Sequence, residues 1–289
     1  MGIKVISDST SYIDINTQEE LGIDLIPLHV HFPDEQFAET EVDYDYFYNK
    51  VERTGIIPTS SQPSLGCMID KFREIASHGD DILAIFLSSA MSGTYETALN
   101  AREKIINEFP DIRIDIMDSY TNCMALGMQV IAAAREIKNG ANMNAALQAA
   151  EYVRDRVRFY FVPETLKYLK KGGRMGTASA LLGMILNIRP ILTVDMKTGM
   201  THLFDKTRGT SVAIKRMLKQ LEEDREKYGL KEILIHHINA PEKAENLKKM
   251  LMERYGLPVE IRPIGPVIGL HTGLGTVGFV YYTEAKPAT

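Results

Sequence analysis

The chain has 289 residues, of which 45% are hydrophobic and 25% charged, and its net charge at pH 7 is −5. This length suits one large α/β domain or two smaller ones, and the negative charge argues against nucleic acid or an anionic membrane as the main partner. No stretch approaches the roughly 18 consecutive apolar residues of a membrane-spanning helix, so we expect no stable membrane insertion. Cys67 and Cys123 form neither a disulfide framework nor a zinc motif, which favours a reduced, cytoplasmic setting.

In the first half of the chain, apolar runs of strand length alternate with amphipathic segments. The predicted strands span 3–7, 23–32, 82–87 and 112–117. The predicted helices span 44–51, 65–75, 95–106 and 122–138. Leu65, Ile69, Phe72 and Ile75 have the spacing of one apolar helix face. This alternation predicts a Rossmann-like α/β domain over residues 1–155, with a mostly parallel sheet flanked by helices.

The pattern changes after a further predicted helix over 144–153. Predicted strands follow at 159–162, 191–195, 200–204, 232–237, 258–261 and 275–282, the second and third forming a hairpin. Predicted helices lie at 178–188, 211–221 and 242–255. We therefore expect a second α/β domain over residues 156–289, with a mixed sheet and helices.

Two hydroxyl-rich turns precede predicted helices. Residues 58–64 read Pro-Thr-Ser-Ser-Gln-Pro-Ser, and residues 88–95 read Ser-Ser-Ala-Met-Ser-Gly-Thr-Tyr. Backbone N–H groups at a helix N-terminus attract anions, and without a lysine or arginine such a site suits one carboxylate better than a polyphosphate. Taken singly, each turn is explained by helix capping. As a pair, they suit the crevice where open α/β sheets bind ligands.

Asp8 and Asp118 each follow a buried strand directly. Two such carboxylates could hold Mg²⁺, but we favour the simpler interpretation that each accepts hydrogen bonds from the following turn, because no phosphate-binding loop accompanies them. The segment 273–278 matches GxGxxG, yet a strand and not a helix follows it. We expect no cofactor and no metal.

A glycine-flanked histidine and a basic turn mark the second half. His271 lies in a predicted loop over 265–273, where a histidine is more often functional than structural. The basic turn over 170–176 could bind phosphate or, more simply, cap the carbonyls of the preceding helix. The helix predicted after it is apolar around its circumference, which is typical of plain core or of the wall of an apolar cavity.

Together these segments resemble the DegV family, bacterial fatty-acid-binding proteins that include the fatty acid kinase B subunits. The matching segments, in chain order, are 7–10, 58–64, 88–95, 118–119, 172–174 and 265–273. The resemblance covers nearly the whole chain and implies two α/β domains with one fatty acid held between them.

The resemblance also implies roles for individual residues. The ligand carboxylate would meet hydroxyls at Ser60 and Ser92, beside Ser61 and Gly93, with His271 nearby. Many family members carry threonine where this chain has Ser60, and serine keeps the hydroxyl. Arg174 would lie where the ligand is presented to a partner kinase. The apolar tunnel for the tail would be lined by Met175, Leu181, Met184 and Ile185, the methionines being adaptable.

The sequence therefore predicts a carrier and not an enzyme. The protein would bind a palmitate- or oleate-like acid and present it to a separate ATP-binding fatty acid kinase subunit, which forms the acyl phosphate. One alternative is a magnesium-dependent enzyme acting on a small phosphorylated or carboxylated substrate through Asp8, Asp118 and His271. Another is a sensor whose lipid occupancy controls a partner protein.

Overall fold

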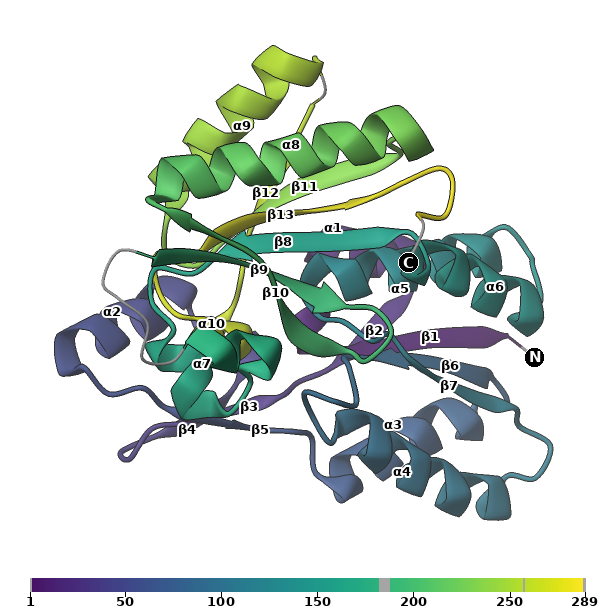
Figure 1. Cartoon of the computed structure of the whole chain (residues 1–289). Coiled ribbons are helices and arrows are strands. Elements are labelled where there is room, and N and C mark those ends of the chain that lie inside the picture. The colour runs from purple at the N-terminus through teal and green to yellow at the C-terminus, as the bar shows by residue number, and fades with distance from the viewer. Residues whose placement is uncertain (1, 182–187, 257, 288–289) are drawn as a thin grey trace. The chain divides into compact units, whose positions relative to one another are not determined.

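The structure, a computed structural model, describes residues 2–181, 188–256 and 258–287 (Figure 1). The chain divides into two compact units. The first comprises Met1–Glu41, Ser60–Arg154 and Met196–Gly199, and the second comprises Val42–Thr59, Asp155–Asp195 and Met200–Thr289. Each unit thus takes a segment from the other's half of the chain. The division after residue 155 stays a prediction about folding domains.

The first unit is built on a four-stranded parallel sheet with the order β2-β1-β6-β7. Its strands are β1 (Ile3–Asp8), β2 (Ile23–Ile26), β6 (Asp81–Phe86) and β7 (Ile114–Asp118). From β1 the chain first adds β2 on one side and then β6 and β7 on the other. The order therefore reverses between β1 and β6, and open α/β sheets bind ligands beyond the carboxyl ends of such a pair.

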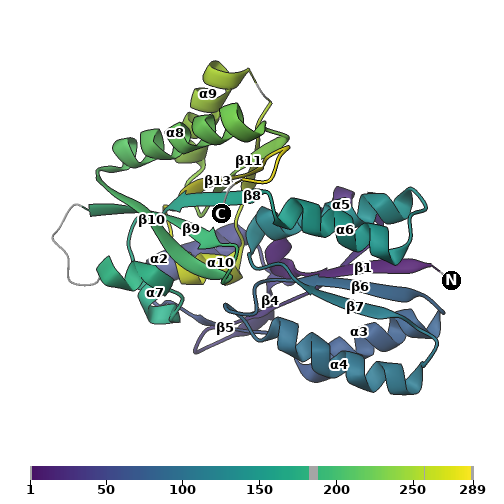
Figure 2. The same cartoon turned by 45° about the vertical axis from the view of Figure 1, so that its right-hand side comes forward.

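Helices cover both faces of this sheet. They are α1 (Ile15–Leu21), α3 (Leu65–Ser77), α4 (Thr94–Glu108), α5 (Cys123–Lys138) and α6 (Met143–Arg154). Figure 2 shows α3 and α4 on one face and α5 and α6 on the other. Beneath α3 and α4, Ile6, Phe72, Phe86 and Ile105 are buried in one apolar cluster. This confirms a parallel sheet flanked by helices.

Helix α3 shows how local sequence sets an element. The hydroxyl of Ser64 accepts the Cys67 N–H and caps the helix, which supports its first turn. Met68, Phe72 and Ile75 form its buried face, whereas Leu65 is 37% exposed. The predicted apolar face is thus rotated, with Met68 taking the place assigned to Leu65.

A small three-stranded sheet lies mostly within the first unit, and its first two strands in chain order pair antiparallel. It has the strand order β4-β3-β5, with β3 (His29–His31), β4 (Gln36–Ala38) and β5 (Thr59–Ser61). The single strand predicted over 23–32 is wrong: β2 and β3 belong to different sheets, with Pro27 between them. Proline cannot donate to a strand ladder, which explains the break.

The second unit contains a six-stranded mixed sheet with the order β10-β9-β8-β13-β11-β12. Its strands are β8 (Val157–Val162), β9 (Ile188–Asp195), β10 (Met200–Arg208), β11 (Glu232–His237), β12 (Glu260–Pro263) and β13 (Val277–Tyr282). The β11–β12 pair is parallel and the other pairs are antiparallel, which confirms the predicted mixed sheet. Helices α8 (Thr210–Tyr228) and α9 (Pro241–Tyr255) cover one face, over a core that includes Met217, Leu247 and Phe279.

Three shorter helices also belong to this unit: α2 (Tyr44–Thr54), α7 (Lys167–Gly172) and α10 (Pro266–Thr272). The hydroxyl of Tyr48 in α2 donates to the carbonyl of Ile264 at 2.6 Å. A Cβ on Gly269 would lie 2.3 Å from that hydroxyl, so only glycine fits there. Lys171 Nζ in α7 donates to the carbonyl of Ile57 at 2.6 Å. These bonds explain why residues 42–59 belong with the second unit.

Two predictions in this unit are wrong in part. The predicted loop over 265–273 contains helix α10. The helix predicted over 178–188 is a 3-10 helix, η3, at Gly176–Leu181, and Ile188 begins strand β9. Ala180 is exposed, so this segment is not apolar core throughout, and residues 182–187 lie outside the described residues. Within the described ranges, no helix combines the length and apolar character needed to cross a membrane.

Candidate functional site

Buried polar side chains surround the carboxyl ends of β1 and β6. The Asp8 carboxylate accepts hydrogen bonds from Thr10 N at 2.9 Å, from Thr10 Oγ1 at 2.5 Å and from Leu87 N at 2.8 Å. Burial raises the pKa of this carboxyl to about 6, against the opposing effect of these bonds. The bonds from Thr10 confirm the simpler interpretation, and the bond from Leu87, which was not predicted, ties the end of β1 to the end of β6.

Asp118 has the same role at the end of β7. It accepts the Tyr120 N–H at 2.8 Å and the Ser89 N–H at 3.3 Å. In the part of the chain that the structure describes, no group of three or more His, Cys, Asp or Glu side chains could hold a metal ion. The magnesium-dependent enzyme, which needs only the two carboxylates and a substrate, stays an alternative prediction.

The turn over 58–64 differs from its predicted form. Ser60 and Ser61 lie in strand β5, and the helix begins at Leu65, as predicted. The prediction that hydroxyls of this turn occupy a helix N-terminus is therefore wrong for Ser60 and Ser61 and holds for Ser64. Ser64 alone caps that helix. Ser60 is half-buried, and Ser61 Oγ lies 2.8 Å from His31 Nε2 on the neighbouring strand β3. The hydroxyls of β5 therefore belong to a strand and not to the first turn of a helix.

The turn over 88–95 leads directly into α4, as predicted. Gly93 is the N-cap residue, and it has no side chain of its own to cap the helix. Ser92 Oγ accepts the Thr94 N–H at 3.3 Å and lies 2.9 Å from Thr94 Oγ1. Since both Thr94 groups can donate to it, Ser92 can direct its own proton at an incoming acceptor.

Gln62 brings the two turns together, and sequence reasoning missed it. Its Nε2 donates to Thr97 Oγ1 in α4 at 3.0 Å. Its carboxamide also covers Gly93, where a Cβ would lie 2.4 Å from Gln62 Oε1. The space above Gly93 is therefore filled by Gln62. Within the first unit, the Gln62 side chain therefore links the turn over 58–64 to the first turn of α4.

In the second unit, the structure brings His271 and Arg174 together. Burial and, to a smaller extent, the positive charge of Arg174 lower the pKa of His271 to about 4. A Cβ on Gly172 would lie 2.2 Å from His271 Nδ1, so the absence of a side chain at that position lets α7 approach α10. This contact could not be predicted from a local sequence motif, because Gly172 and His271 are far apart in the chain.

The basic turn caps the end of α7. Gly173 adopts a left-handed conformation, the Arg174 N–H donates to the carbonyl of Leu169 at 3.0 Å, and the Arg174 guanidinium donates to the carbonyl of Gly172. This confirms the capping interpretation. Of the predicted tunnel residues, Met175 and Leu181 are buried in this unit, whereas Met184 and Ile185 lie outside the described residues.

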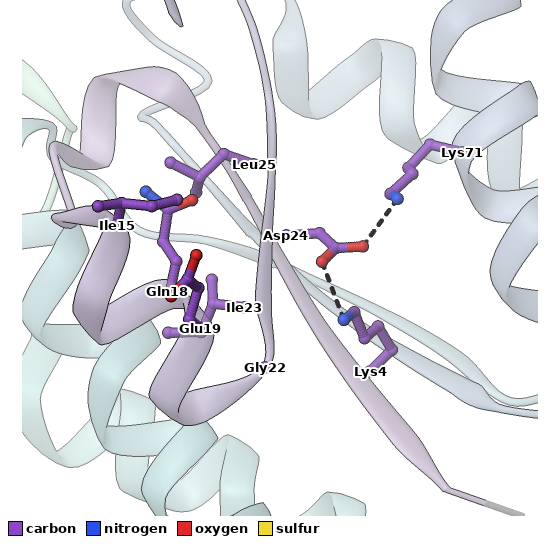
Figure 3. Close-up of a pocket in the computed structure, with 9 residues that line it drawn as sticks. All are labelled: Lys4, Ile15, Gln18, Glu19, Gly22, Ile23, Asp24, Leu25 and Lys71. Carbon is purple, nitrogen blue, oxygen red and sulfur yellow. Dashed lines mark ion pairs between the residues drawn. The ribbon is translucent and has the colours of Figure 1, made fainter.

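The first unit also has a pocket at its edge strand β2 (Figure 3). Its volume is about 530 Å³, and it is lined by Lys4, Ile15, Gln18, Glu19, Gly22, Ile23, Asp24, Leu25 and Lys71. Asp24 pairs with Lys4 at 2.9 Å and with Lys71 at 2.7 Å. Burial opposes ionisation of Asp24, but the hydrogen bonds from the two lysines prevail and hold its pKa below the usual value. Of the described residues that line the pocket, none is a predicted site residue.

The fold and site define a class of protein: a two-unit α/β protein with a doubly wound sheet, hydroxyl-rich turns near its switch point and a second unit with a mixed sheet. The family model for the uncharacterised DegV proteins matches residues 2–284, and the chain belongs to the DegV family. A DegV domain-containing protein of Clostridium acetobutylicum is 43% identical over 284 residues, which cover 98% of this chain and 99% of that protein.

Two solved structures of relatives share this fold. The structure of fatty acid binding by a DegV family protein from Thermus thermophilus matches with a TM-score of 0.87 and 30% identity, covering 98% of this chain and 100% of that one. DegV of Bacillus subtilis, a fatty acid binding protein, matches with a TM-score of 0.86 and 34% identity, covering 98% of this chain and 99% of that one. Both relatives bind fatty acids.

Proposed function

We propose that this protein binds one long-chain fatty acid, with hydroxyls of Ser60 and Ser92 holding the carboxylate. The observation that carries the proposal is the junction of the two hydroxyl-rich turns through Gln62, in a family with fatty-acid-binding members of the same fold. The ligand is palmitate- or oleate-like, and the protein acts as a carrier.

The chemistry of the turns favours a single carboxylate. Ser92 sits at the N-terminus of the 15-residue helix α4, where the helix dipole favours negative charge. Hydrogen bonds to an ionised acceptor are about twice as strong as neutral ones, so two hydroxyls can hold one carboxylate. Ser61 assists from the same strand. His271 as a neighbour of the carboxylate, and a ligand position between two domains, stay predictions.

Burial of the tail supplies most of the affinity. Each buried methylene contributes roughly 0.8 kcal/mol, so a chain of about sixteen carbons contributes on the order of 10 kcal/mol before ordering costs. Met175 and Leu181 are buried apolar side chains in the second unit and fit the proposed role of tunnel lining. Methionine suits such a wall because its side chain adapts to different shapes.

Extraction and binding measurements test this proposal. We expect mass spectrometry of gently extracted protein to find bound fatty acid, and Ser92→Ala to weaken palmitate binding by about 1–3 kcal/mol, because it removes a donor to a buried charge. Ser77→Ala is the matched control, since its hydroxyl donates only to Glu74 at the far end of α3. Unchanged affinity in a Ser60→Ala/Ser92→Ala variant would place the carboxylate elsewhere. Absence of lipid, together with no binding of palmitate or oleate, would refute fatty acid binding itself.

The proposed partner is a separate kinase subunit that supplies ATP and the phosphoryl transfer, with Arg174 at the contact surface. Arg174 is exposed and lies on the turn that ends α7. We expect acyl phosphate to form only when palmitate-loaded protein, ATP and a fatty acid kinase ATP-binding subunit are combined. Acyl phosphate formed by this chain and ATP alone would contradict the carrier role.

A further inference from the structure

Ser88 organises the turn that carries Ser92. It is fully buried at the end of β6, where its N–H donates to the carbonyl of Thr121 at 2.8 Å. Its carbonyl accepts the N–H groups of Met91 at 3.0 Å and Ser92 at 3.1 Å, and its Oγ accepts the Ala90 N–H at 3.2 Å. One side chain and its backbone thus fix three successive N–H groups of the turn.

The remaining bond of Ser88 reaches a distant part of the chain. Its hydroxyl proton is donated to the carbonyl of Gly199 at 2.8 Å, and residues 196–199, between β9 and β10, belong to the first unit. Gly199 has φ +67°, and a Cβ there would lie 2.1 Å from Ser88 Oγ and 3.4 Å from Tyr120 Cδ1. Only glycine combines this backbone conformation with so close an approach.

We propose that Ser88 and Gly199 are positioning residues for the carboxylate site. The bond between them holds the turn over 88–93 in the one conformation in which Ser92 presents its proton to the ligand. This inference rests on the proposed function. Without this bond, the turn over 88–93 would become less ordered. A carboxylate would then bind more weakly, because charge-assisted hydrogen bonds depend strongly on distance and direction, whereas a neutral headgroup would be affected less. The pair therefore affects binding of the carboxylate and not burial of the tail.

Binding of two ligands with the same tail tests the inference. We expect Ser88→Ala to weaken palmitate binding roughly 3- to 20-fold, the usual consequence of a lost hydrogen bond, and to change 1-hexadecanol binding less than about twofold. Thr283→Val is the matched control: Thr283 is also fully buried and donates its hydroxyl to a backbone carbonyl, that of Ala285, in the second unit. Thr283→Val should lower the melting temperature about as much as Ser88→Ala does, but it should leave the affinities for palmitate and for 1-hexadecanol unchanged.

A double-mutant cycle tests the contact itself. Gly199→Ala should weaken palmitate binding in the wild-type background, because its Cβ displaces Ser88 Oγ. In the Ser88→Ala background the same change should cost clearly less, since the nearest side-chain atom is then the residue 88 Cβ, 3.2 Å away. Equal effects of Gly199→Ala in the two backgrounds would overturn the inference.

The outcomes separate this inference from the proposed function. If Ser92→Ala weakens palmitate binding while Ser88→Ala does not, or if Ser88→Ala weakens palmitate and 1-hexadecanol equally, the positioning role is refuted and the carboxylate site stands. If Ser92→Ala and Ser60→Ala/Ser92→Ala leave palmitate binding intact, the carboxylate site is refuted and the positioning role falls with it.

Discussion

At Gly172 the backbone of α7 meets the imidazole of His271 with no room for a side chain. Gly172→Ala should push the imidazole away and lower the free energy of unfolding by about 1–3 kcal/mol, the usual cost of overpacking. Thermal and urea denaturation measure this. Gly66→Ala in α3 is the control: its nearest neighbour would be 3.9 Å away, so it should be neutral or slightly stabilising.

The His271→Ala background tests the cause of that loss. If the contact with the imidazole is responsible, Gly172→Ala should cost much less once the ring is gone, because coupled neighbours are not additive. An equal loss in both backgrounds would contradict the contact. A cost for Gly66→Ala as large as that for Gly172→Ala would mean that crowding is not the cause.

Individual site residues could be predicted only where the local pattern carries the signal. The density of hydroxyls marked the two turns, and the family resemblance then singled out Ser60 and Ser92, which stay predictions. The roles of Gly172 and Gly199 depend on His271 and Ser88, which are far away in the chain, and glycine itself gives no sign of which atom approaches it. Close contacts of this kind have no local signature.

At the scale of elements, Gln62 is the link between strand β5 and helix α4. Gln62→Ala removes its hydrogen bond to Thr97 and its cover over Gly93. We expect the free energy of unfolding to fall by about 0.5–1.5 kcal/mol, and amide exchange in β5 to become faster. Hydrogen-exchange mass spectrometry on peptides spanning 58–64 measures the second effect.

Thr97→Val completes a double-mutant cycle with Gln62→Ala, since it removes the hydroxyl that accepts the Gln62 hydrogen bond and keeps the side-chain volume. The double variant should lose less stability than the sum of the single variants. Strictly additive losses, with unchanged exchange in β5, would show that Gln62 does not join the two elements.

The apolar periodicity of the sequence predicted the long helices and strands, but it did not predict short elements that depend on contacts with distant residues. It placed β11 at 232–237 as observed and α9 within one residue of its start, because each has a regular apolar pattern and clear ends. Helix α10 has only seven residues, and its Gly269 is required by Tyr48 from α2. Strand β5 consists of hydroxyl residues with no apolar alternation, so nothing in it reads as a strand.

For the whole molecule, His236, His271 and Asp8 make the largest contributions to the dependence of stability on pH. Burial lowers the pKa of His236 to about 3 and, with Arg174, that of His271 to about 4, both from 6.5. Burial raises the pKa of Asp8 to about 6 from 3.8. The histidines bind protons more readily when unfolded, so their contribution is lost as pH falls below 6.5. Asp8 binds its proton more readily when folded, so its contribution is lost as pH rises toward 6.

On unfolding in this pH range, the two histidines take up more protons than the Asp8 carboxyl releases. We therefore expect the free energy of unfolding to rise by about 1 kcal/mol per pH unit between pH 4.5 and 6. Urea denaturation at several pH values measures it. Asp8→Asn should make the rise steeper, because it removes the opposing group, and His271→Asn should make it shallower. Stability that falls with pH across this interval would contradict these ionisation states.

The exchange of segments between the units sets an order of events during synthesis. Tyr48 lies 216 residues before its partner Ile264, and Ser88 lies 111 residues before Gly199. At roughly 5–20 residues per second, Tyr48 waits on the order of 10–40 s on the ribosome for that partner. Meanwhile Phe47 and Val51, buried in the finished protein, lack their final surroundings. Neither unit can be completed by the N-terminal half of the chain, so the nascent protein is a natural client for chaperones until elongation nears its end.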